Sequence, residues 1–122
     1  MITESYLNKL QNNKSIGVDL DGTLAHYIKF DPNHIGDPIP KMIDRVKQWI
    51  SNGIRIKIFT ARATDPKNIP AIKQWLDKNG LEGLEITNIK DPDMIAIFDD
   101  RAIQVEKNTG EILGDISKIK GI

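Results

Sequence analysis

Apolar residues recur along the chain in two different periods, which together predict alternating strands and helices. Short runs of continuous or alternating apolar residues are typical of buried strands, and they occur at residues 15–20, 54–59, 84–88 and 94–98. Steps of three and four residues, which place apolar side chains on one face of a helix, occur at residues 3–11, from Pro40 to Gly53, and from about 65–70 to 79. Residues 102–106 and 111–113 flank a turn-like segment and predict a terminal hairpin.

The order of these elements predicts an α/β fold. Continuous apolar strands separated by helices are typical of a mostly parallel sheet with helices on both faces. We therefore expect a single domain, residues 1–122, with a three-layer Rossmann-like core at about 15–113. Right-handed crossovers would then bring the strand ends to one edge of the sheet, at Asp19, Thr60, Lys90 and Asp99.

The connection after the first strand, residues 22–39, is much longer than the roughly 2–6 residues usual in such units. Beside a polar strand end, it is a candidate active-site flap; the simpler interpretation is a surface loop. His26 and His34 lie in it. Either could contact a substrate, although loop histidines more often only face solvent.

Composition narrows the functional classes. The chain of 122 residues contains 17 basic and 17 acidic residues, so it lacks the positive field that general nucleic-acid binding requires. No apolar run reaches the ~20 residues of a membrane span, and the N-terminus lacks a secretory pattern. The absence of cysteine suits a reducing compartment. We therefore expect a cytoplasmic protein without a membrane partner.

The first strand ends in the segment Asp19-Leu20-Asp21-Gly22-Thr23, which is the main candidate for chemistry. Two carboxylates this close resist joint ionisation, so they need a shared proton or a divalent cation. Gly22 can adopt a positive φ and lets the chain turn sharply beside them. The alternative is an ordinary Asx-type turn with solvated acids. The later strands favour a functional site over an ordinary turn, because the strand at 94–98 also ends in paired carboxylates, Asp99-Asp100.

With these segments the chain resembles the haloacid dehalogenase superfamily of phosphatases and phosphotransferases. The resemblance covers about residues 15–103. It rests on four motifs in order, namely Asp19 to Thr23, Thr60, Lys90, and Asp99-Asp100. The spacing between the motifs leaves no room for a cap domain, so the chain resembles the small capless members. Their sites are open unless another subunit covers them, which allows for a homo-oligomer.

The resemblance implies a role for each motif residue. Asp19 would be the nucleophile that forms an aspartyl-phosphate, and Asp21 would be the general acid and base. Mg²⁺ would be held by Asp19, the backbone carbonyl of Asp21, and Asp99. Thr60 and Lys90 would bind the phosphoryl oxygens. Further phosphate-binding candidates are Leu20 and Ala61, and weaker candidates for supporting or substrate-binding roles are Asp100, Arg62 and Arg101.

The expected function is therefore a Mg²⁺-dependent phosphomonoester hydrolase acting on a small molecule or on the end of a macromolecule. A phosphotransferase would use the same residues, and only its products would differ. A non-catalytic module that binds Mg²⁺ and phosphate is a third possibility, although binding alone needs neither a nucleophile nor an acid. The third motif departs from the family pattern, because only Asp91-Pro92-Asp93 separates Lys90 from the last strand, where a helix is usual.

Overall fold

The computed structural model describes residues 13–122 and contains a four-stranded sheet with two α-helices. The strands are β1 (Ser15–Val18), β2 (Arg55–Phe59), β3 (Glu85–Thr87) and β4 (Met94–Phe98). The helices are α2 (Pro40–Ser51), α3 (Ile69–Lys78) and the short 3₁₀ turns η1 (Ala61–Thr64) and η2 (Pro66–Asn68). The predicted helix at residues 3–11 lies outside the described residues.

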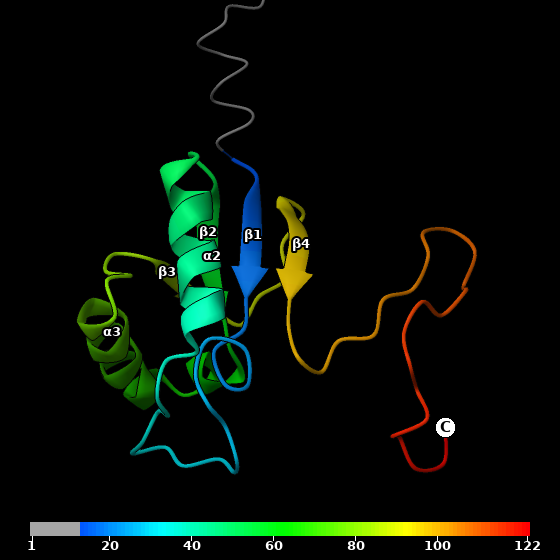
Figure 1. The fold of residues 1–122 in the computed structure, drawn as a ribbon, viewed down its shortest axis with the longest axis horizontal. Helices are drawn as coiled ribbons and strands as arrows, with labels where there is room; N and C mark the ends of the chain where they lie inside the picture. Colours follow the sequence, from blue (N-terminus) through cyan, green and yellow to red (C-terminus); the bar gives the residue numbers. More distant parts are fainter. Residues whose placement is uncertain (1–12) are drawn as a thin grey trace, which may run out of the picture.

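All four strands are parallel, in the order β3-β2-β1-β4 (Figure 1). The prediction of an α/β fold with a parallel sheet is confirmed. Val18, the last residue of β1, is in register with Ile58 of β2 and Phe98 of β4. The residues that follow β1 and β4 therefore emerge side by side, as the strand-end argument requires.

Both α-helices pack on the same face of the sheet. Alternate residues of β2, Ile56 and Ile58, belong to one buried cluster together with Val46 of α2 and with Ile72 and Leu76 of α3. Figure 1 shows α2 in front of β2 and beside β1. Two consecutive right-handed crossovers in one direction put both helices on that side. Among the described residues no α-helix connects β3 to β4, so helices on both faces remain a prediction.

The ends of α2 follow from local chemistry. Pro40 is its first residue, where a missing N–H costs no helical hydrogen bond. Gly53, just past its end, has a φ of 82° that favours glycine. The start of α3 is less regular, because η1 and η2 precede Ile69 in place of a continuous helix. Asp65 caps η2 by accepting a hydrogen bond from the Lys67 N–H.

The predicted terminal hairpin is reduced to one antiparallel bridge between Val105 and Ile112. The Glu106 N–H donates to the Glu111 carbonyl at 2.8 Å, which closes the expected turn. This segment runs away from the sheet after β4 (Figure 1) and does not pair with it. Within residues 13–122, none of the helices has the length and apolar character that crossing a membrane requires.

Candidate active site

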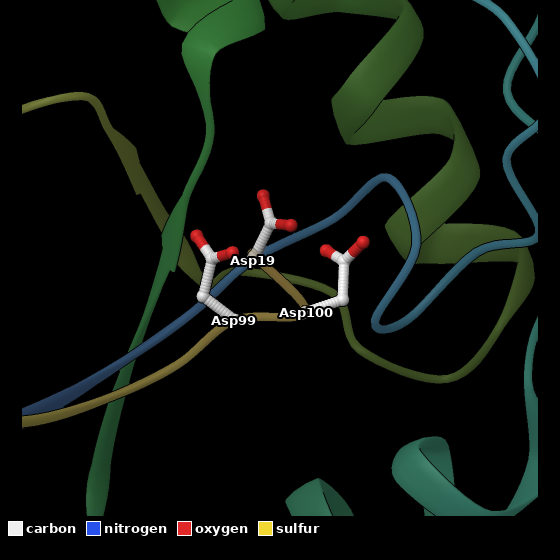
Figure 2. A group of neighbouring side chains, drawn as sticks. All are labelled: Asp19, Asp99 and Asp100. Atoms are coloured by element: carbon white, nitrogen blue, oxygen red, sulfur yellow. The ribbon is translucent and has the colours of Figure 1, made fainter. Parts of the chain in front are cut away.

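Three carboxylates meet where β1 and β4 end (Figure 2). Asp19 follows β1, Asp99 and Asp100 follow β4, and one carboxylate oxygen from each lies within 4.8 Å of the others. The Asp19 N–H continues the pairing of the two strands by donating to the Phe98 carbonyl at 2.9 Å. The expected meeting of Asp19 and Asp99 is thus seen in the structure. Asp100, a weaker candidate from sequence, completes the group of carboxylates.

The electrostatics of this group favour a cation. Burial, the largest cause, and the neighbouring Asp99 and Asp100 carboxylates together raise the pKa of Asp19 to about 8, while a hydrogen bond from the Leu20 backbone opposes them. Like charges held this close need a proton or a metal ion. All three donors are carboxylate oxygens, which suit a hard divalent cation such as Mg²⁺. The residues therefore fit the ion that the resemblance implies.

The glycine and threonine of the first motif position Asp100. The Thr23 hydroxyl donates to the Asp100 carboxylate at 3.3 Å and accepts a hydrogen bond from the Asp100 N–H at 3.2 Å. Gly22 has a φ of 90°, and a Cβ there would overlap the Asp100 carboxylate. The turn after Asp21 thus needs glycine for two reasons, backbone conformation and space.

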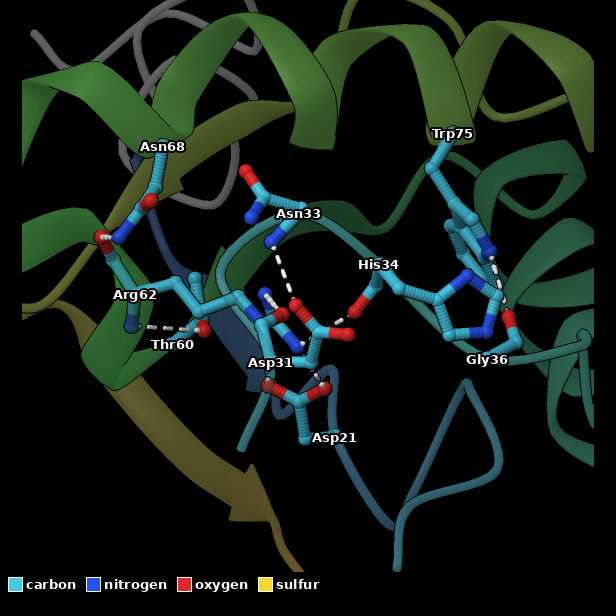
Figure 3. Close-up of polar contacts among 9 residues, drawn as sticks. All are labelled: Asp21, Asp31, Asn33, His34, Gly36, Thr60, Arg62, Asn68 and Trp75. Carbon is cyan, nitrogen blue, oxygen red and sulfur yellow. Dashed lines mark hydrogen bonds and ion pairs between the residues drawn. The ribbon is translucent and has the colours of Figure 1, made fainter. Parts of the chain in front are cut away.

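Asp21 is held by Arg62 in a two-pronged ion pair (Figure 3). The Arg62 Nε and Nη2 donate to the two Asp21 carboxylate oxygens at 2.7 and 3.0 Å. The remaining donors of Arg62 reach the carbonyls of Asp31 and His34 in the loop at residues 22–39, called the flap from here on. Arg62 is buried. The sequence suggested it only as a contact for a second anionic group, so this role was missed.

Local structure explains how Arg62 comes to face Asp21. Thr60, at the end of β2, is buried and caps η1 by accepting a hydrogen bond from the Arg62 N–H at 3.2 Å. Asn68 donates to the Arg62 carbonyl at 3.0 Å. The backbone N–H and carbonyl of Arg62 are therefore both bonded, in a conformation in which the guanidinium reaches Asp21. The available sequence signal was an arginine two residues after the threonine of a strand-end motif.

A cavity of about 860 Å³ contains most of these groups. Five of the residues that the sequence singled out line it, namely Asp19, Asp21, Thr60, Ala61 and Asp99. The Leu20 side chain is instead fully buried in the core.

The basic residues near the cavity differ in their partners. Lys90 is exposed and is not one of the residues that line the cavity. Lys57 is paired with Asp91 at 2.8 Å. Arg101 lines the cavity, lies over the Tyr27 ring at 5.7 Å, and forms no ion pair within residues 13–122. Arg101 is therefore better placed than Lys90 to neutralise a bound phosphate.

The flap is anchored at its base. The His26 N–H donates to the Asp37 carbonyl at 2.8 Å, and the Trp75 indole N–H donates to the Gly36 carbonyl at 2.8 Å (Figure 3). His26 and His34 are exposed and do not line the cavity. The prediction of a flap beside the site agrees with the structure, since Tyr27, Phe30 and Pro32 all contribute to the cavity wall.

Comparisons with known proteins address the fold alone. No protein-family model and no curated protein sequence matches the chain. A solved structure of a conserved protein from Bacteroides thetaiotaomicron is similar, with a TM-score of 0.59 and 20% sequence identity. The match covers 72% of this chain and 76% of that one. At this identity, the similarity supports the α/β architecture and says nothing further about the site.

Proposed function

We propose that the chain is a Mg²⁺-dependent phosphomonoester hydrolase that resembles the small capless members of the haloacid dehalogenase superfamily. The observation that carries the proposal is the group of three carboxylates from Asp19, Asp99 and Asp100. Two of them, Asp19 and Asp99, line the same cavity as Thr60 and Asp21. A site that only bound a cation would not need the further acid, Asp21, two residues after the first ligand.

In the first half of the reaction, an Asp19 carboxylate oxygen attacks phosphorus in line, and the bond from phosphorus to the ester oxygen breaks. Asp21 donates a proton to the departing oxygen. In the second half, Asp21 takes a proton from water while that water attacks phosphorus and releases Asp19. When bound by Asp19, Asp99 and Asp100, Mg²⁺ would neutralise their charge and part of the phosphate charge.

The Arg62 pair constrains this scheme. Both Asp21 oxygens accept hydrogen bonds from Arg62, and these bonds are weaker when Asp21 carries the proton that it transfers, because the acceptor has then lost its charge. They keep the carboxyl oriented. Thr60 would donate its hydroxyl to a phosphoryl oxygen, and Arg101 would offset the charge that develops on the phosphoryl group.

The same proposal includes the finer architectural predictions. The segment from Asp21 to Thr60 contains the flap, α2 and β2, and the segment from Thr60 to β4 contains η1, η2, α3 and β3. Within the described residues these elements account for both segments, which supports the proposal of a capless, open site that substrate or a second copy of the chain would cover. A three-layer core and a cytoplasmic location remain predictions.

The test is the release of inorganic phosphate from 4-nitrophenyl phosphate with Mg²⁺ and with EDTA. We expect activity that requires the metal, that Asp19→Asn abolishes, and that Asp44→Asn, a change at an exposed position of α2, leaves intact. A beryllofluoride adduct on Asp19, detected by ¹⁹F NMR, would support the covalent step. Activity that persists in both Asp19→Asn and EDTA would contradict the proposal.

A further inference from the structure

The cavity that holds the carboxylates also has an aromatic wall. Tyr27 and Phe30 from the flap and Phe59 from the end of β2 line it together with Asp19 and Thr60. None of the three rings belongs to the buried core cluster. Phe30 is 56% exposed, so its ring contributes little to packing. An exposed ring beside candidate catalytic groups is a surface on which a flat ligand can stack.

Two of these rings are held in place by guanidinium groups. The Arg62 guanidinium lies 5.1 Å from the centre of the Phe30 ring, and the Arg101 guanidinium lies 5.7 Å from the centre of the Tyr27 ring. Because Arg62 is buried and paired with Asp21, its contact with the ring brings Phe30 near the proposed acid. A guanidinium occupies one face of a ring and leaves the other face for a second flat group.

Polar groups accompany the rings. Asn68 and Asn88 line the same cavity. Their side-chain N–H groups donate to the Arg62 carbonyl and to the Thr64 hydroxyl, and their amide oxygens can accept hydrogen bonds from the edge of a nucleobase. The volume of about 860 Å³ lies within the range of roughly 300–1,000 Å³ that is typical of small-molecule sites. We propose that the substrate is a nucleoside monophosphate, whose base stacks on the wall formed by Phe30 and Tyr27 while its phosphate reaches Asp19. This inference rests on the proposed hydrolase function.

Hydrolysis of nucleoside 5′-monophosphates and of ribose 5-phosphate provides a matched comparison, because both release a primary alcohol of the same sugar. Stacking on one aromatic side chain predicts a kcat/KM that is roughly 10- to 100-fold higher for AMP and UMP than for ribose 5-phosphate. In Phe30→Ala, we expect this ratio to fall to within about threefold. In Ile28→Ala the ratio should persist, since Ile28 is an almost fully exposed flap residue that does not line the cavity.

Binding of adenosine alone, followed by NMR or calorimetry, separates this inference from the hydrolase proposal. We expect adenosine to bind the wild type and the Ile28→Ala variant, and to bind Phe30→Ala much more weakly. Adenosine binding of this kind by a protein without phosphatase activity would refute the hydrolase proposal and support the aromatic binding site. Equal kcat/KM for AMP and ribose 5-phosphate, a preference for hexose phosphates, or adenosine binding that ignores Phe30→Ala would each overturn the inference.

Discussion

Replacing Arg62 by methionine tests whether the ion pair with Asp21 maintains the site. The substitution keeps a long apolar side chain but removes the guanidinium, which is 4% exposed beside a carboxylate that is 17% exposed. Asp21 would lose two hydrogen bonds to a charged donor, and the Asp31 and His34 carbonyls would lose one each. An uncompensated carboxylate would remain in a mostly buried position.

Breaking a buried pair from one side costs about 3–5 kcal/mol, while a domain of this size has a total stability of about 5–15 kcal/mol. We therefore expect Arg62→Met to lower the free energy of unfolding by about 3 kcal/mol or more, measured by urea denaturation. Arg62→Lys keeps the positive charge but cannot donate to both Asp21 oxygens in the same planar geometry, and we expect it to lower the free energy of unfolding by about half as much. Arg45→Met, at an exposed position of α2, should stay within about 0.5 kcal/mol of wild type.

A double-mutant cycle with Asp21→Asn isolates the pair. In that background the carboxylate charge is gone, so adding Arg62→Met should cost only about 1–2 kcal/mol. The reasoning fails if Arg62→Met costs less than about 1 kcal/mol, or if its cost is the same in both backgrounds. Either result would mean that water compensates Asp21 and that Arg62 stabilises the fold by packing alone.

Three further predictions concern the charges around the site. Because the pKa of Asp19 is raised to about 8, the folded protein keeps a proton that the unfolded chain releases near pH 4; without metal, the free energy of unfolding should fall as the pH rises from about 4 to 8. Mg²⁺ should then raise the melting temperature more at pH 8 than at pH 5.5, and an equal rise at both would contradict the assignment. Arg101→Ala should lower kcat/KM by about 10²-fold and Lys90→Ala by less than about twofold. If phosphate-release kinetics show the larger loss in Lys90→Ala, Lys90 and not Arg101 neutralises the phosphate. Gly22→Ala should weaken Mg²⁺ binding, followed by calorimetry, and destabilise the fold by more than about 1 kcal/mol. Gly110 has a similar φ, but nothing lies within 4 Å of a Cβ added there. Gly110→Ala should therefore destabilise the fold only through backbone strain and leave Mg²⁺ binding unchanged.

The sequence predicted the sheet and the meeting of Asp19 with Asp99 because both depend on local patterns. Apolar runs located β1, β2 and β4, and the parallel topology then requires the ends of neighbouring strands to lie together. The pattern could not predict that α2 and α3 share one face, because periodicity identifies the buried side of a helix without saying which side of the sheet it covers. The order β3-β2-β1-β4 supplies that information.

The ion pair between Asp21 and Arg62 was beyond the reach of sequence patterns for a different reason. The two residues are 41 positions apart, and either carboxylate of the first motif could have faced a metal or an arginine. The capped turn at η1 determines that Arg62 pairs with Asp21, because it directs Arg62 away from solvent. Lys90 is the opposite case, a residue that a sequence pattern singled out for the site. Its position after β3 made it the candidate for the third motif, but it is exposed and does not line the cavity.

Arg62 also connects parts of the site that a mechanism must coordinate. Its side chain contacts the proposed acid and two flap carbonyls, while its ring partner Phe30 forms part of the cavity wall. A ligand that stacks on Phe30 would contact a ring whose other face lies against the guanidinium bonded to Asp21. The bonds between that guanidinium and Asp21 are weaker when Asp21 is protonated, as the acid step requires. If both proposals hold, the base of the substrate would affect kcat as well as KM, because binding energy at the ring would be used to free the acid. A ring that only improved binding would change KM alone.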